Sequence, residues 1–304
     1  MAVGLRTQEL RRTIRRDLSR SSQTAAPPLG HLAGLHRLAS AGDLFALSFD
    51  PGRPAMAGGA GMLEVAMLAD LALGGAIRNR VGLAVPMPTI SMTIQFAAGR
   101  ASEVVWADGE CSTQLTSTAT SRSRLRTSAG EVIGDAQGVF SLPPLPYGGP
   151  GRPMPWDSCA EQVSVGIGGE RGLRPAEECI VDQVAAHAAG TPNRAWGTTH
   201  VERQMAMRGD TLAMTPTEAM INRLGHVQGG ALFTAAILAA ATRRAFPIDT
   251  LVTGTIEYVD AAKLDDPILA PVTVLRASRR SLFASVALVQ DRRTCCHVAT
   301  VFRR

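Results

Sequence analysis

The chain has 304 residues, of which 45% are hydrophobic, and this length suits one large or two medium domains with ample core-forming material. The net charge of +5 is spread along the chain without interleaved aromatic residues, so we expect no nucleic-acid partner. No run of about 18 apolar residues is present and the N-terminus is charged, which together predict a soluble cytoplasmic protein with no membrane partner.

The first part of the chain contains a basic segment, a linker and a unit of one helix followed by strands. Residues 1–30 are predicted to form a peripheral amphipathic helix (5–20) and a Ser/Ala/Pro linker. A first domain is expected over 31–142. Its elements are a strand near 44–49, a helix over about 62–80, and strands near 88–97, 102–114, 115–126 and 131–141.

Residues 143–196 interrupt this pattern. Prolines dominate the first part of the segment and predict an extended linker, whereas Pro175 to His187 has a proline start and an acidic first turn, which predict a short helix. The length of the segment is explained if it spans two fused domains. A lid over a ligand site is the alternative.

A second domain, 197–304, repeats the order of the first. Strands are predicted near 198–206 and 210–215, followed by a glycine turn and an apolar helix, and then by strands near 250–260, 268–277, 281–290 and 295–303. One helix followed by a run of meandering strands, twice over, predicts the α+β class.

The two units also echo one another in sequence. Thr93-Ile94-Gln95-Phe96 matches Thr255-Ile256-Glu257-Tyr258, and Val139-Phe140 matches Val301-Phe302. Both matches are offset by 162 residues. Equal offsets at two separate places indicate an internal duplication.

A polar turn leads into the helix of the second unit. The turn contains Asn222, Gly225 and Gln228-Gly229-Gly230, and the helix that follows carries no charge before Arg243. Such a helix is buried on most sides. Because Gly229 and Gly230 have no side chains, the N–H groups of the first turn can approach a carbonyl oxygen or an anion closely.

The pattern Asn-x-x-Gly-x-x-(His or Gln)-Gly-Gly before an apolar helix resembles the 4-hydroxybenzoyl-CoA and phenylacetate-pathway (PaaI-like) branch of the hotdog-fold acyl-CoA thioesterases. The resemblance covers about 44–142 and 197–304. With the duplication it implies a tandem double hotdog, in which two antiparallel sheets each wrap a central helix and one chain supplies a pseudo-dimer. It also implies an acyl-CoA substrate and hydrolysis without a cofactor, and we expect a homodimer of these two-domain chains.

The resemblance assigns the polarising groups to the second domain. The N–H of Gly230 and the side-chain amide of Gln228 would hold the thioester carbonyl, and Asn222 would hold the turn or add a hydrogen bond. The family's carboxylate lies nine positions after the His or Gln of the motif, where this chain has Ile237. The second domain therefore lacks its own acid.

Asp70, in the helix of the first domain, is the expected base or nucleophile, because hotdog sites combine the acid of one domain with the glycine turn of the other. It lies among apolar residues, where a carboxylate is costly unless it has a partner or faces a cavity. Nine positions before Asp70 stands Gly61 and not His or Gln, so a shifted register would make Glu64 the acid instead.

Substrate-binding residues follow from the same comparison. Gly229, Phe233 and Thr234 are expected beside the acyl group, in a channel that Met62, Ala66 and Leu68 help to line, and Arg279 and Arg280 are candidates for the phosphates of CoA, as are Arg243 and Arg244. His226 is an alternative general base. The five cysteines have no metal-site or disulfide spacing, so no metal is expected.

A different class of function remains open. The loss of the acid at Ile237 favours a non-catalytic acyl-CoA-binding or regulatory protein. An Asp70 on the outer face would support that alternative, whereas an Asp70 facing the Gln228 turn would support the enzyme. A hotdog hydratase is discouraged because the sequence lacks the Asp/His pair of those relatives.

Overall fold

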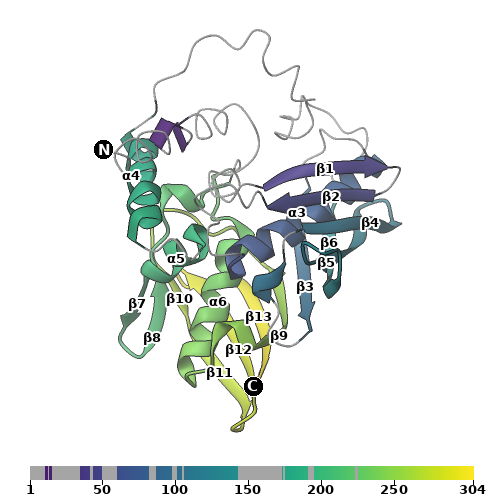
Figure 1. Ribbon diagram of the computed structural model, residues 1–304. Helices are drawn as coiled ribbons and strands as arrows, with labels where there is room; N and C mark the ends of the chain where they lie inside the picture. The colour runs from purple at the N-terminus through teal and green to yellow at the C-terminus, as the bar shows by residue number, and fades with distance from the viewer. Residues whose placement is uncertain are drawn as a thin grey trace.

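The computed structural model (Figure 1) describes residues 11–12, 14–15, 35–41, 44–49, 60–81, 87–97, 101–104, 106–142, 173, 175–190, 195–222 and 225–304. The predicted linkers at 21–30 and 143–155 and most of the predicted helix 5–20 lie outside the described residues.

The described strands form one 13-stranded sheet in which every pair of neighbours is antiparallel. The order is β1-β2-β4-β5-β6-β3-β9-β13-β12-β10-β8-β7, with β11 beside β12. The strands are β1 (Leu35–Ala41), β2 (Leu44–Phe49), β3 (Thr89–Phe96), β4 (Trp106–Gln114), β5 (Thr118–Arg126), β6 (Val132–Ser141), β7 (Met205–Arg208), β8 (Thr211–Met214), β9 (Leu251–Tyr258), β10 (Ile268–Ala270), β11 (Val272–Ala277), β12 (Ser281–Gln290) and β13 (Arg293–Arg303).

Two buried helices lie side by side against this sheet (Figure 1). Helix α3 (Met62–Val81) packs on β2, β4, β5 and β6, and α6 (Gly229–Arg243) packs on β9, β12 and β13. Most residues of both helices are buried, which matches their Ala- and Leu-rich sequences. One meandering sheet with central helices confirms the predicted α+β class and double hotdog architecture.

The two halves join where β3 pairs with β9. At the centre of this pairing Thr93 faces Thr255, and their hydroxyl oxygens lie 3.0 Å apart. These are the two residues that the 162-residue offset makes equivalent. A twofold relation between two repeats passes through a residue pair of this kind, so the pairing agrees with the predicted duplication.

The predicted strand near 198–206 was wrong, because Trp196–Arg203 forms helix α5. The β-branched residues Thr198, Thr199 and Val201 favour a strand locally, but tertiary packing overrides that preference. Trp196 stacks on His200, one helical turn later, with ring centroids 4.9 Å apart. Helix α5 packs against both α3 and α6.

Other differences are smaller. Strand β1 was not predicted, and the strand expected over 268–277 is divided into β10 and β11 at Pro271, which has no N–H to donate to a neighbouring strand. Helix α4 (Pro175–Gly190) agrees with the predicted short helix. Arg11 and Arg15 of the N-terminal segment form ion pairs with Asp182 and Glu178 of α4, at 3.1 and 2.8 Å. Three short 3-10 helices complete the elements: η2 (Ala101–Glu103), η3 (Glu218–Met220) and η4 (Ile248–Thr250).

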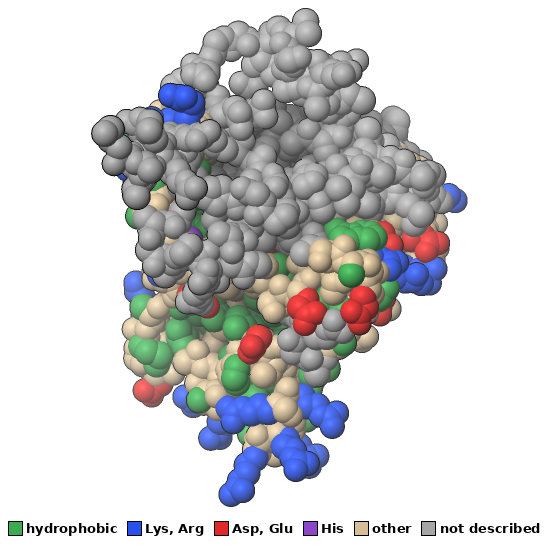
Figure 2. Space-filling model, in the orientation of Figure 1, with side chains coloured by type: hydrophobic (Ala, Val, Ile, Leu, Met, Phe, Trp, Pro, Cys, Tyr) green, Lys and Arg blue, Asp and Glu red, His purple; other side chains and the backbone are tan. Residues whose placement is uncertain are grey.

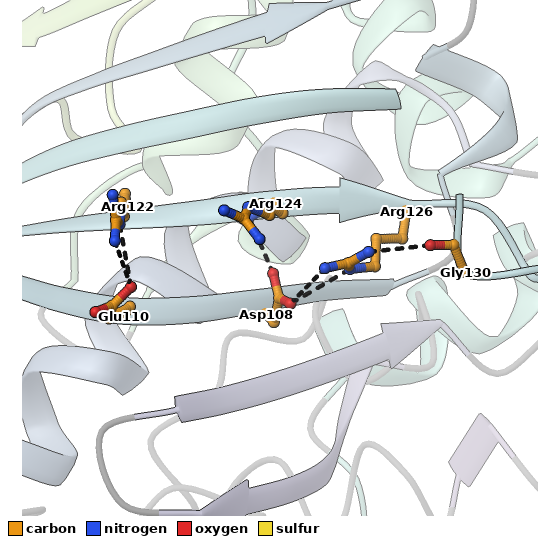
Figure 3. A network of polar contacts seen from close by, with 6 residues as sticks. All are labelled: Asp108, Glu110, Arg122, Arg124, Arg126 and Gly130. Carbon is orange, nitrogen blue, oxygen red and sulfur yellow. Dashed lines mark hydrogen bonds and ion pairs between the residues drawn. The ribbon is translucent and has the colours of Figure 1, made fainter. Parts of the chain in front are cut away.

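The outer face of the first half carries a ladder of charges (Figure 3). Arg122 of β5 bonds Glu110 of β4 at 2.8 Å, and Arg126 bonds Asp108 at 3.1 Å. Asp108 also accepts a hydrogen bond from the backbone N–H of Arg124. These side chains alternate with residues that face α3, so the charges lie on the opposite side of the sheet from the helices and bind one another.

No helix in the described ranges is long and apolar enough to cross a membrane.

Candidate active site

A cavity of about 480 Å³ lies between the two halves of the molecule. The first half contributes the middle of α3, the start of β3 and Phe140, and the second half contributes the turn before α6 and the residues at the end of β9. Because β3 and β9 are antiparallel, the start of one strand lies beside the end of the other. The cavity is therefore built at one end of the central strand pair by both repeats.

The turn before α6 is held by Asn222. Its side-chain oxygen accepts a hydrogen bond from the N–H of His226 at 3.1 Å, and its N–H donates to the carbonyl of the same residue at 2.7 Å. Gly225 has a φ of +79°, a left-handed conformation that favours glycine. Asn222 thus fixes the loop that brings His226 and Gln228 to the cavity wall.

Gln228 caps the first turn of α6. Its side-chain oxygen accepts a hydrogen bond from the N–H of Ala231 at 3.1 Å, so the amide nitrogen is left as a donor. Within the described part of the chain, neither this nitrogen nor the N–H groups of Gly229 and Gly230 have an acceptor. Gln228 and Gly229 line the cavity. The positive end of α6 therefore offers several unused donors at or beside this wall.

Asp70 of α3 lines the same cavity. One carboxylate oxygen accepts a hydrogen bond from the hydroxyl of Thr89 at 2.8 Å. Burial raises the pKa of Asp70 above 3.8, and the Thr89 hydrogen bond and the positive charge of Arg78 only partly oppose this shift. A half-buried carboxylate thus shares one cavity with the donors of the second half.

The sequence did not single out Tyr258, although it lines the cavity. An added Cβ on Gly229 would overlap the Tyr258 hydroxyl and would lie 2.8 Å from the ring carbon that carries it. The aromatic ring therefore needs a glycine at the start of α6. Comparison of the two repeats could have pointed to this residue, because Tyr258 has a hydroxyl where the equivalent Phe96 of the first repeat has none.

Several predicted site residues lie elsewhere. Gly230 packs beside Met67 and the Gln228 side chain and is not one of the residues that line the cavity. The ring of Phe233 packs over Gly254, and the Thr234 hydroxyl donates to the Gly230 carbonyl at 2.8 Å. Neither residue lines the cavity, and Met62, Ala66 and Leu68 do not line it either. The apolar lining comes instead from other residues, among them Met67, Leu71, Met87, Phe140 and Leu232.

The structure does not bring Arg279 and Arg280 to the cavity. They are exposed at the turn between β11 and β12. Figure 2 shows basic side chains gathered at the lower end of the molecule. The carbonyl of Arg280 accepts a hydrogen bond from Arg304, whose guanidinium in turn contacts Ala245, just beyond the end of α6. The start of α6 is about 20 Å away along a helix of this length.

Glu64 also lies away from the cavity. Its buried carboxylate accepts hydrogen bonds from the Thr198 hydroxyl at 2.6 Å and from the Thr198 N–H at 3.1 Å. The same hydroxyl accepts a hydrogen bond from the N–H of Leu63 at 2.9 Å. The first turn of α3 is thereby closed by α5, whereas the first turn of α6 opens toward the cavity.

Comparisons with known proteins agree with this architecture. Residues 217–304 match the family model described as the acyl-CoA thioesterase N-terminal domain. Comparison with curated proteins finds no match. Solved structures that resemble the chain include an oleoyl thioesterase (putative) from Lactobacillus plantarum, with 16% identity and a TM-score of 0.50, covering 81% of this chain and 90% of that one. The tesB protein of Mycobacterium avium subsp. paratuberculosis has 11% identity and a TM-score of 0.50, covering 91% of this chain and 98% of that one.

At these identities the two structures bear on the fold, and both extend over most of the chain. The family model adds the acyl-CoA thioesterase domain in the second half. The narrower resemblance to the 4-hydroxybenzoyl-CoA and phenylacetate branch stays a prediction. Residues 217–304 therefore carry a domain similar to the acyl-CoA thioesterase family, and the likeness to these solved structures supports the double hotdog fold over most of the chain.

Proposed function

We propose that the chain hydrolyses acyl-CoA thioesters to the free acid and CoA at a single composite site between its two hotdog domains. The observation that carries this proposal is the shared cavity, in which Asp70 of the first half lies with Gln228 and Gly229 of the second half. A carboxylate and a set of free N–H donors are the two chemical functions that thioester hydrolysis requires.

The donors act on the carbonyl oxygen. As water attacks, negative charge develops on this oxygen, and the free N–H groups at the start of α6 and the amide of Gln228 stabilise it. Such donors are oriented before the reaction begins, so no reorganisation is needed as the charge develops. The loss of one donor of this kind typically costs about 100-fold or more in rate.

Asp70 acts on the attacking side. It takes a proton from water as the water oxygen bonds the carbonyl carbon; the carbon–sulfur bond then breaks, and the CoA thiolate leaves and is protonated. Direct attack by the carboxylate is the alternative route. The raised pKa of Asp70 favours proton transfer, because a stronger base accepts the proton more readily. Thr89 holds one carboxylate oxygen and so orients the other.

The pseudo-symmetric end of the molecule supports a single site. At that end Phe96 stands at the position equivalent to Tyr258, and Leu251 stands at the position equivalent to Thr89. Ile237, at the position where the family has its acid, is a buried apolar residue of α6. The first turn of α3 is occupied by Thr198. Neither a carboxylate nor a free helix start is thus offered there by these residues.

The apolar part of the wall, formed by residues such as Met67, Leu71 and Leu232, would hold the acyl group. An aliphatic chain fits this lining, because buried apolar surface is the main source of its affinity. We further propose that the protein is cytoplasmic and forms a homodimer of two-domain chains. Light scattering on the purified chain tests the proposed dimer directly.

The decisive experiment measures free-thiol release from acyl-CoAs of short to long chain, including aromatic ones. Wild type, Asp70→Asn and Asp135→Asn are compared. Asp135 is an exposed aspartate of β6 outside the cavity, so its variant makes the same chemical change on the outer face. We expect activity in wild type and Asp135→Asn and a collapse in Asp70→Asn with an unchanged circular dichroism spectrum.

Two results would contradict the proposal. Equal rates for wild type and Asp70→Asn would remove the carboxylate from the chemical step. No thiol release by wild type, together with saturable acyl-CoA binding by calorimetry, would leave a non-catalytic acyl-CoA-binding protein.

A further inference from the structure

Tyr258 lines the cavity, and the proposed reaction has not used its hydroxyl. It is the last residue of β9, and its side chain faces the cavity between Asp70 and the start of α6. Its hydroxyl has no hydrogen-bond partner among the residues that the structure describes. A phenol hydroxyl on a cavity wall is free to bond a polar group of a ligand that enters the cavity.

The position of this hydroxyl is fixed by α6. The ring end packs so closely on the backbone of Gly229 that an added Cβ would lie 2.8 Å from the Cζ atom and 3.0 Å from a neighbouring ring carbon. The hydroxyl therefore lies beside the first turn of α6, whose N–H groups at Gly229 and Gly230 lack acceptors in the described ranges. An acceptor that binds those N–H groups is also within reach of the phenol.

The protonation state suits a donor. Burial raises the pKa of Tyr258 well above 10.0, and the negative charge of Asp70 raises it further. The hydroxyl thus keeps its proton at neutral pH. A group that stays protonated donates a hydrogen bond and does not act as a base.

The other repeat provides an internal comparison. Phe96 occupies the equivalent place at the end of β3 and is 5% exposed. The chain therefore accepts phenylalanine at this position of the repeat where no cavity donors are present, and it has tyrosine where they are. The hydroxyl is not needed for the strand to pack.

We propose that the Tyr258 hydroxyl donates a hydrogen bond to the thioester carbonyl oxygen, beside the N–H groups at the start of α6. The proposal rests on the proposed acyl-CoA hydrolysis and makes Tyr258 a catalytic residue of the same site. It adds a second side-chain donor from the second half, in addition to the Gln228 amide.

The first test is Tyr258→Phe in the full chain. We expect kcat/KM to fall by about 100-fold, the usual effect of losing one donor to a developing oxyanion. The control is Thr253→Val, which removes one hydroxyl from the same strand outside the cavity and should leave the rate unchanged. A Tyr258→Phe enzyme with more than half of the wild-type rate would overturn the proposal.

The pH profile separates a donor from a positioning role. If Tyr258 contacts the carbonyl, the plateau of kcat/KM falls and its acid limb stays where Asp70 sets it. If the hydroxyl acted only through Asp70, the acid limb would move in Tyr258→Phe, and that result would also overturn the proposal.

Binding of two unreactive analogues distinguishes this inference from the proposed hydrolysis. One is a dodecanoyl-CoA analogue in which methylene replaces sulfur and the carbonyl remains; the other is the dodecyl thioether of CoA, which has no carbonyl. We expect Tyr258→Phe to bind the ketone at least about 10-fold more weakly and the thioether equally well. Equal binding of the ketone by wild type and variant, or no binding of it by wild type, overturns the inference whether or not the protein hydrolyses thioesters.

Discussion

Removal of the Thr198 hydroxyl should destabilise the fold without touching the chemistry. Thr198 links α5 to the start of α3, because its hydroxyl donates to the buried Glu64 carboxylate at 2.6 Å and accepts from the Leu63 N–H at 2.9 Å. Thr198→Val keeps the shape and the β-branch of the side chain but deletes both bonds. The Glu64 carboxylate then keeps the backbone N–H of residue 198 as a donor.

The magnitude follows from the two lost contacts. A hydrogen bond to a charged group contributes roughly 1.5–3 kcal/mol, and a buried N–H left without an acceptor costs about 1–3 kcal/mol. The added methyl group offsets about 1 kcal/mol of this loss. We therefore expect a decrease of about 3 kcal/mol in the free energy of unfolding, a large share of the roughly 5–15 kcal/mol that holds a domain folded.

Urea denaturation measures this change, with Thr199→Val as the matched control. Thr199 is the next residue of α5 and is equally buried, but its hydroxyl bonds only the Ala195 carbonyl within its own helix, at 2.8 Å. Its loss should cost about 1 kcal/mol. Thiol release per folded molecule should stay unchanged in both variants, since neither residue lines the cavity.

The stability difference between Thr198→Val and wild type should depend on pH. Burial raises the pKa of Glu64 above 4.5, and the Thr198 hydroxyl is the strongest influence in the opposite direction. Without that hydroxyl the pKa of Glu64 rises further. The variant therefore loses more folding free energy at neutral pH, where Glu64 is ionised, than at low pH, where Glu64 is protonated. The difference between Thr198→Val and wild type should therefore shrink as the pH falls. Equal losses in the two threonine variants, with no pH dependence, would refute the proposed link between α5 and α3.

Three further outcomes are expected. The acid limb of kcat/KM should lie above 3.8, because burial raises the pKa of Asp70, and Asp70→Asn should abolish the limb and leave the thermal midpoint at neutral pH equal or higher, since it removes a desolvated charge. The free energy of unfolding should be highest above about pH 6.5 and decline toward pH 4, because burial lowers the pKa of His200 from 6.5 to about 4. The loss reaches at most about 3 kcal/mol. Urea titrations across this pH range should show a smaller loss for His200→Gln. Gly74→Leu should shift the thiol-release panel toward shorter acyl chains while Gly74→Ala does not, because a Cβ on Gly74 makes an ordinary contact with Phe140 at 3.5 Å and only a longer side chain fills the cavity.

Much of the architecture could be predicted from hydrophobic patterns and from the duplication. Strands β3 and β9 alternate along their length, and the offset of 162 residues matches Thr93 to Thr255, the pair that joins the two halves. The resemblance to the hotdog family, whose sites combine the acid of one domain with the glycine turn of the other, predicted that Asp70 would face the Gln228 turn. The cavity contains both.

The residues around the helices could not be predicted, because a helix that is apolar on every side has no sequence signal for its rotation. Gly229 and Leu232, one turn apart, line the cavity, whereas Phe233 and Thr234 point elsewhere on the same helix. The positions of Arg279 and Arg280 could not be predicted, because the sequence does not show which end of α6 their hairpin turn approaches. In the structure the turn lies near the end of α6 and not near its start.

Helix α5 makes the two ends of the molecule structurally different. A chain that carries both halves can change one end of the pseudo-dimer without changing the other, which a dimer of identical subunits cannot do. At one end the start of α6 keeps free donors next to Asp70 and Tyr258. At the other end Thr198 bonds the start of α3, and Phe96 takes the place of the tyrosine. The second end has thus become part of the core, which favours a catalytic site at one end of the strand pair alone.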